Sequence, residues 1–176
     1  MIFTKLALDG AFLVELKKIE DPRGFFARAF CQREFEQHGL NPRLVQCNIS
    51  FNPARATLRG MHYQRAPFAE VKLVRCIRGG IYDVIIDLRR DSPTYRQWQG
   101  VELTAGNRRM LYVPEGFAHG YLSLTEDSEV FYQVSEFYAP GSEAGIRWND
   151  PAFAIKWPVE PRVISDKDLA HPDFAS

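Results

Sequence analysis

Residues 72–88, which read KLVRCIRGGIYDVIIDL, decide the fold class. Two short segments rich in apolar and β-branched residues flank Gly79-Gly80, a pattern typical of antiparallel strands joined by a tight turn. The same pattern recurs along the chain, where segments rich in Val, Ile, Phe and Tyr alternate with turns rich in Pro, Gly, Asn and Asp. The segments expected to form strands include residues 72–77, 81–88, 110–113 and 129–138. Because these segments are too short for most helices, the sequence predicts a mostly antiparallel β-sandwich or barrel.

Two segments have the pattern of a short helix. Residues 31–38 end before Gly39, and residues 165–170 begin with a serine suited to capping and end before Pro172. No internal repeat, low-complexity tract or change of composition marks a linker. We therefore expect one domain over residues 1–176.

The overall charge narrows the range of partners. The 22 Lys and Arg residues balance the 22 Asp and Glu residues, so the formal net charge is zero. Proteins that bind nucleic acids or anionic membranes usually carry a basic excess, and we expect neither partner. The sequence has no run of about 18 uncharged apolar residues, and its N-terminus is unlike a signal peptide. We expect a cytoplasmic protein.

Alternation along the strands places polar side chains on shared faces, because successive residues of a strand point to opposite sides. Gln46, Asn48 and Ser50 alternate with apolar residues, and within residues 129–138 Tyr132 and Tyr138 have the same parity. A polar strand face most often meets solvent. Several such faces that meet inside a barrel form a polar ligand cavity instead, and the pattern alone leaves both interpretations open.

The four histidines occur in two kinds of context. His38 ends a predicted helix and His171 lies in the polar tail, and we expect both at the surface. His62 and His119 are flanked by glycine and by apolar or aromatic residues, a setting that removes water from an imidazole and makes its pKa adjustable. Either one alone is most simply a hydrogen-bonded core residue. Together with nearby basic residues and tyrosines, they favour a catalytic site.

A metal site is the main alternative use of these histidines. Residues 114–119 have the Pro-x-Gly-x-x-His pattern of the second cupin motif, but the first motif offers His62 and Gln64 where a metal-binding cupin has two histidines. The three cysteines form no CxxC pair that would indicate zinc. Two imidazoles are a weak ligand set for a first-row metal. We expect no metal, and a metal-dependent cupin enzyme is the alternative.

A set of motifs in a fixed order, spanning nearly the whole chain, resembles one known family. They are Asp21-x-Arg23-Gly24-Phe25-Phe26, Gln46-x-Asn48-x-Ser50, residues 58–64 (LRGMHYQ), Lys72, Asp83 with Asp87-Leu88-Arg89, residues 113–120 (VPEGFAHG), Tyr132, Tyr138, residues 145–151 (GIRWNDP) and residues 165–168 (SDKD). This combination resembles the dTDP-4-dehydrorhamnose 3,5-epimerases. The resemblance implies a cupin-like jelly roll, all β with a few short helices, and a homodimer that exchanges N-terminal strands. It also implies no metal or organic cofactor and a nucleotide-linked 4-keto-6-deoxyhexose as the substrate.

The resemblance further implies the residues of the site. Four are catalytic: His62 removes a proton, Asp168 orients its imidazole, Lys72 stabilises the enolate oxygen and Tyr132 returns a proton from the opposite face. The substrate-binding residues are Arg23, Gln46, Asn48, Arg59, His119, Tyr138, Glu143 and Lys167. The basic side chains in this set predict a basic pocket in a protein without net charge.

One position departs from the family pattern. Arg28 stands where the family usually has a glutamate that reaches the nucleotide, so the sequence leaves the nucleotide open. We expect inversion at C3 and C5, as in the conversion of dTDP-4-dehydro-6-deoxy-D-glucose to dTDP-4-dehydro-L-rhamnose. The alternatives are inversion of a single carbon on a different nucleotide sugar, and a sugar-binding module without activity.

Overall fold

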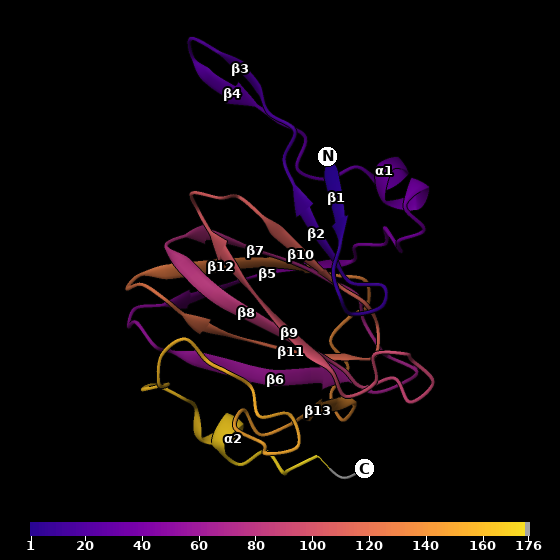
Figure 1. Cartoon of the computed structure of the whole chain (residues 1–176), viewed down its shortest axis with the longest axis vertical. Coiled ribbons are helices and arrows are strands. Elements are labelled where there is room, and N and C mark those ends of the chain that lie inside the picture. Colours follow the sequence, from indigo (N-terminus) through magenta and orange to yellow (C-terminus); the bar gives the residue numbers. More distant parts are fainter. Residues whose placement is uncertain (175–176) are drawn as a thin grey trace.

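The regular secondary structure of the protein is almost all β-strand, and the strands form two packed sheets and a separate hairpin (Figure 1). The computed structural model describes residues 1–174, so the last two residues of the predicted domain lie outside this range. The larger sheet has the order β1 (Ile2–Lys5), β2 (Phe12–Glu15), β10 (Met110–Val113), β7 (Lys72–Arg78), β12 (Ser128–Val134) and β5 (Gln46–Asn52). The smaller sheet has the order β13 (Glu143–Gly145), β6 (Leu58–Gln64), β11 (Phe117–Ser123), β8 (Gly80–Asp87) and β9 (Trp98–Thr104). The hairpin is β3 (Ile19–Asp21) and β4 (Gly24–Phe26), and the two helices are α1 (Gln32–Gln37) and α2 (Asp166–Leu169).

The main core lies between the two sheets. The larger sheet contributes Val74 and Val130, and the smaller sheet contributes Ile85 and Leu103, all fully buried. The outer face of the smaller sheet is covered by the C-terminal segment, residues 146–174, through apolar side chains that include Ile146, Phe153, Trp157 and Phe174. Each fully buried aliphatic or aromatic side chain stabilises the fold by about 1.5–3 kcal/mol. This packing holds the C-terminal segment beside β6.

Most predicted elements match the structure. The strands predicted at residues 72–77, 81–88 and 110–113 are β7, β8 and β10. The helices predicted at residues 31–38 and 165–170 are α1 and α2 together with their capping residues. None of the helices within residues 1–174 is long and apolar enough to cross a membrane.

The strand predicted at residues 129–138 ends earlier, at Val134 in β12. Val134 pairs on one side with Gln46, the first residue of β5, and on the other side with Lys72, the first residue of β7. Residues after Val134 therefore have no strand partner on either side. Tyr138 lies in a loop, and the prediction that it shares a strand with Tyr132 is wrong.

β6 and β11 come very close together at Gly60 and Gly120. A Cβ atom on Gly60 would lie 2.5 Å from Gly120 Cα, and Gly60 has φ +131°, a conformation that side chains disfavour. His62 and His119 are paired across these two strands, next to a shift in register. The two glycines thus allow the histidine-bearing strands to meet.

The hairpin of β3 and β4 stands away from both sheets (Figure 1). Its apolar side chains are uncovered: Ile19 is 66% exposed and Phe26 is 73% exposed. At its turn, Arg23 pairs with Asp21 at 2.6 Å. Exposed apolar side chains grouped in this way are typical of a surface that another molecule covers.

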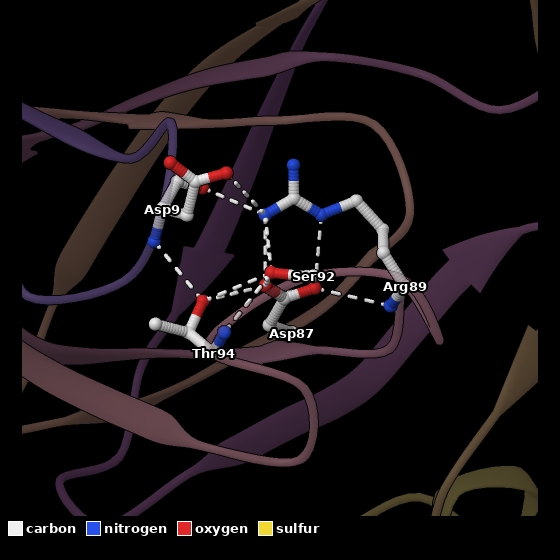
Figure 2. Close-up of polar contacts among 5 residues, drawn as sticks. All are labelled: Asp9, Asp87, Arg89, Ser92 and Thr94. Atoms are coloured by element: carbon white, nitrogen blue, oxygen red, sulfur yellow. Dashed lines mark hydrogen bonds and ion pairs between the residues drawn. The ribbon is translucent and has the colours of Figure 1, made fainter.

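A buried carboxylate fixes the end of β8 to the turn between β1 and β2 (Figure 2). Asp87 is fully buried and accepts hydrogen bonds from Arg89, Ser92 and Thr94. Arg89 also donates to the backbone oxygen of Asp9 at 2.7 Å. Burial by itself raises the pKa of Asp87, but the hydrogen bonds from these three side chains hold that pKa below its ordinary value.

Replacing this carboxylate tests its contribution to stability. We expect Asp87→Asn to lower the free energy of unfolding by about 2–3 kcal/mol at neutral pH, because Arg89 loses the nearer of its two carboxylate partners. Since the folded pKa is lowered, the difference from the wild type is fully present above the unfolded pKa of about 3.9 and is lost as the pH falls through the folded pKa. Urea unfolding between neutral and acidic pH measures it. The exposed Asp91→Asn is the control, and an equal loss in both variants contradicts the assignment.

Candidate active site

A cavity of about 460 Å³ is lined by both sheets and by the segment that carries α2. A smaller cavity of about 180 Å³ shares the side chains of His62, Lys72 and Tyr132 with it. Among the site residues predicted from the sequence, the larger cavity is lined by His62, Tyr132, Asp168, Lys72, Arg59, His119 and Lys167. The smaller cavity adds Gln46, Asn48, Tyr138 and Glu143. The structure therefore brings together all the predicted site residues except Arg23.

An imidazole and a carboxylate from distant parts of the chain meet at the cavity wall. His62 Nε2, on β6, lies 2.7 Å from Asp168 Oδ1, on α2. Asp168 Oδ2 accepts the backbone N–H of Gly60 at 3.0 Å. A neutral His62 donates its Nε2–H to the carboxylate, which leaves Nδ1 as a free acceptor. Burial by itself raises the pKa of Asp168, but the hydrogen bond and charge of His62 hold it below its ordinary value.

The backbone before α2 explains how Asp168 reaches β6. The Leu58 N–H of β6 donates to Val163 O at 2.9 Å, which attaches the C-terminal segment to the start of that strand. Ser165 then caps α2, and its hydroxyl accepts the N–H of Asp168. The serine that signalled a helix start in the sequence thus also orients the carboxylate.

Lys72 and Tyr132 project into the same cavity from neighbouring strands of the larger sheet. Lys72 Nζ pairs with Glu70 at 2.7 Å, and both side chains are nearly buried. The same ammonium lies 6.0 Å from the centre of the Tyr132 ring. Burial raises the pKa of Tyr132, so the phenol keeps its proton at neutral pH. Glu70 was not predicted as a site residue, and its role as the partner of Lys72 emerges only from the fold.

His119 forms a second pair of imidazole and carboxylate, separate from the first. Its Nε2 lies 2.6 Å from Asp83 Oδ1 on β8, and the Asp83 carboxylate is fully buried. The metal alternative required His62 and His119 to bind the same metal ion. Each ring is instead engaged by a carboxylate of its own.

The prediction of a basic pocket is wrong, because the basic groups are locally neutralised. Lys72 is paired with Glu70, and Lys167 donates to Glu143, which raises the pKa of Lys167. Arg59 differs from them: it donates to the neutral oxygens of Asn52 and Phe51, at 2.8 and 3.1 Å. Arg59 is therefore the cation of the cavity best placed to attract an anion.

Asn52 holds Arg59 in place from a fully buried position. Its amide also donates to Ser128 O at 3.1 Å and lies 3.3 Å from the Tyr121 hydroxyl. That hydroxyl is 2.6 Å from the hydroxyl of Ser50. Tyr121 was not predicted as a cavity residue, although its parity with His119 on β11 was a usable signal.

A smaller polar group frames the second cavity. The Tyr138 hydroxyl donates to Glu143 at 3.2 Å, and Gln46 donates to Asn48 at 3.1 Å. The predicted amide face of β5 thus lines a cavity rather than facing bulk solvent.

His171 is partly enclosed, so the expectation that it lies at the surface is wrong. Its side chain is 12% exposed, and its ring packs edge-on against His62 with 5.5 Å between the ring centres. The tail turns back because Pro172 O accepts the N–H of Arg147, and Phe174 packs on Phe153. Burial lowers the pKa of His171.

With this geometry in view, comparisons with known proteins identify the family. Residues 5–176 match the model of the family described as dTDP-4-dehydrorhamnose 3,5-epimerase. The chain belongs to this family.

Relatives of this epimerase family match over nearly their full length. The dTDP-4-dehydrorhamnose 3,5-epimerase of Methanothermobacter thermautotrophicus is 46% identical over 94% of this chain and 90% of its own length. The crystal structure of the Bacillus anthracis epimerase, with TDP and pyrophosphate bound, is 41% identical and superposes with a TM-score of 0.94 over 98% of this chain and 99% of that one. The Legionella pneumophila epimerase, in complex with dTDP-4-keto-L-rhamnose, is 37% identical with a TM-score of 0.90, covering 98% and 92% of the two chains. The cupin-like jelly roll expected from the motifs is confirmed.

Removing the buried amide of Asn52 tests how the cavity of this epimerase fold is supported. We expect Asn52→Ala to lower the free energy of unfolding by about 2–3 kcal/mol, because Arg59 and Tyr121 lose a partner. The half-buried Asn48→Ala, on the same strand, is the matched control and is expected to change stability by less than about 1 kcal/mol. Urea unfolding measures both, and equal losses contradict the proposed support.

Proposed function

We propose that the protein converts dTDP-4-dehydro-6-deoxy-D-glucose to dTDP-4-dehydro-L-rhamnose by inverting C3 and C5. The observation that carries the proposal is the pair of His62 and Asp168 on the wall of a cavity that Lys72 and Tyr132 also line. Relatives that are 40–46% identical carry the name of this epimerase, which supports the same substrate here. We expect the enzyme to work in the cytoplasm with side chains alone and no cofactor.

Proton removal begins at His62. The C4 ketone acidifies the hydrogens on C3 and C5, and Nδ1 of His62 is the ring nitrogen left free to accept one of them. As the ring becomes an imidazolium, the adjacent Asp168 carboxylate stabilises its charge without taking the proton. The buried position of Asp168 strengthens this interaction, because little water competes for it.

Lys72 and Tyr132 complete the inversion. The Lys72 ammonium stabilises the negative charge that develops on the enolate oxygen. Tyr132, on the strand next to Lys72, then donates its phenolic proton to the carbon from the side opposite His62. Because burial raises its pKa, the phenol is protonated at neutral pH and ready to act as the acid.

The remaining predicted residues bind the nucleotide. Arg59, together with His119 and Lys167, contacts the diphosphate, and Arg59 is the strongest candidate because no carboxylate engages it in residues 1–174. The substrate-binding group in the smaller cavity is Gln46, Asn48, Tyr138 and Glu143. Tyr138 lies in a loop and is 56% exposed, which leaves its ring free to stack on a base.

A single-carbon epimerase is the second candidate. The crystal structure of ChmJ, a 3'-monoepimerase from Streptomyces bikiniensis, also superposes on this chain, with a TM-score of 0.86 and 34% identity. Tyr132 favours the double reaction, because inversion at C5 requires an acid placed on the face of the sugar opposite His62.

We also propose that residues 1–176 form one domain that works as a homodimer with exchanged N-terminal strands. Arg23 lies on the protruding hairpin, 89% exposed and outside both cavities of its own chain. Exchange carries it to the cavity of a second copy. The uncovered Phe26 of the hairpin and the exposed Ile49 and Phe51 of the edge strand β5 supply apolar surface for such an interface.

Two substitutions separate the roles of base and acid. We expect His62→Asn to lower the rate of epimerisation by about 10²–10⁴-fold, because it removes the base. Tyr132→Phe is expected to release a product inverted at one carbon only. NMR of the sugar products distinguishes these outcomes. The control is His38→Asn, which leaves the cavity intact, and complete double inversion by Tyr132→Phe contradicts the role of the phenol.

Coexpression of two defective chains tests the exchange. Arg23→Ala disables the hairpin of one chain, and His62→Asn disables the body of the other. If the hairpins are exchanged, a mixed dimer has one cavity with an intact body and an intact hairpin. We expect the mixture to recover about a quarter of the wild-type rate. His62→Asn mixed with Asp168→Asn is the matched control and recovers nothing, because both defects lie in the body. Failure of the first mixture to recover, with both chains present in the purified dimer, contradicts the exchange.

A further inference from the structure

A third side chain faces the His62 and Asp168 pair without taking part in the proposed reaction. His171 Nε2 is buried and has no hydrogen-bond partner within residues 1–174. It lies 3.6 Å from Asp168 Oδ1, which is too long for a hydrogen bond. A buried polar atom without a partner is costly, and a fold that retains one needs a reason.

The fold holds this ring in place. Gly145, on β13, leaves the space that the ring occupies, because a Cβ atom there would lie 2.3 Å from His171 Nε2 and Cε1. Gly145 is paired with His62 across β13 and β6, so the same position borders both histidines. The backbone bond from Arg147 to Pro172 fixes the tail just beyond the ring, at 3.1 Å.

We propose that His62, Asp168 and His171 form a binding site for a borderline divalent transition metal, Zn²⁺ in the first place, and that the bound metal switches the enzyme off. Two imidazole nitrogens and one carboxylate oxygen are a ligand set that suits Zn²⁺. The inhibition, though not the binding, rests on the function proposed above.

The separations between the three ligand atoms need only small changes to fit one metal ion. One ligand atom from each residue lies within 4.8 Å of the other two. Zn²⁺ bonds of about 2.0–2.2 Å place neighbouring tetrahedral ligands about 3.3 Å apart. The two separations from Asp168 Oδ1 are 2.7 Å to His62 and 3.6 Å to His171, on either side of that value. Asp168 Oδ2 is held by Gly60, and Oδ1 binds the metal in place of its hydrogen bond from His62.

The metal competes directly with catalysis. It takes the Nε2 of His62 that otherwise donates to Asp168. The neutral ring then carries its proton on Nδ1, so Nδ1 can no longer accept a proton from the sugar. The His62 side chain is 33% exposed and lines the cavity, which gives a water molecule access to the fourth coordination position. The zinc-bound protein therefore cannot remove a proton from the sugar.

Calorimetric titration of the full-length, metal-free protein with zinc chloride tests the site without using its activity. We expect one Zn²⁺ per chain with micromolar affinity, and no comparable binding of the harder Mg²⁺. His171→Phe keeps an aromatic ring in the same space and removes the ligand nitrogen. It is expected to weaken zinc binding by at least about tenfold. His38→Phe removes a histidine stacked on Phe3 outside the cavity and is the matched control.

Gly145→Ala is a second variant, because its methyl group displaces the His171 ring while the imidazole remains in the chain. Weaker zinc binding in both His171→Phe and Gly145→Ala, with wild-type binding in His38→Phe, supports the site. Equal zinc binding in the wild type and His171→Phe overturns it, as does a wild type that binds no zinc at micromolar concentrations.

Proton exchange into the keto sugar gives the second measurement. We expect zinc to suppress exchange by the wild type and EDTA to restore it. His171→Phe is expected to need at least about tenfold more zinc for the same fractional loss of its own metal-free rate. Equal inhibition of both proteins overturns the switch. Specific zinc binding by a metal-free protein that never exchanges substrate protons overturns the proposed function but leaves the metal site standing.

Discussion

The buried carboxylate of Asp168 is the group on which the rest of the site depends. A charge removed from water is stable only when its oxygens are hydrogen-bonded, and Gly60 and His62 supply one partner each. Asp168 sits on a helix of four residues that is too short to hold itself in place. Its position comes from Val163, bonded to β6 before the helix, and from Pro172, bonded to Arg147 after it. The contacts that dock the C-terminal segment therefore also bring Asp168 to His62.

Local pairing of charge also explains how a chain without net charge builds a polar cavity. Lys72 and His119 each face a carboxylate of their own, at 2.7 and 2.6 Å, so neither adds a free positive charge to the cavity. Arg59 is held by neutral oxygens and keeps its charge for a ligand. A dianionic substrate then meets one strongly attracting cation, Arg59, beside side chains whose charges are already paired. This arrangement orients the substrate more than it raises its overall attraction to the cavity.

The fold could be predicted from the sequence because alternation and turn residues are local signals, and most of the site because the ordered motifs resemble those of one family. Strands such as β7 and β10 and both short helices follow from the local signals, and the ordered motifs identified the family. The errors concern tertiary contacts. Tyr138 leaves its strand because both neighbouring strands end, and His171 is enclosed by a tail whose polar sequence favoured the surface. Arg23 is a different case: it lies outside both cavities of its own chain, and its predicted role depends on the exchange proposed above.

The central claim is that His62, supported by Asp168, removes protons from the carbons next to a ketone. Incubation of the wild-type protein in deuterated water with dTDP-, GDP- and CDP-linked 4-keto-6-deoxyhexoses, followed by NMR, tests it most directly. The account predicts deuterium at both C3 and C5 of the dTDP-linked sugar. Substrates that keep all their carbon-bound protons with every nucleotide would contradict it.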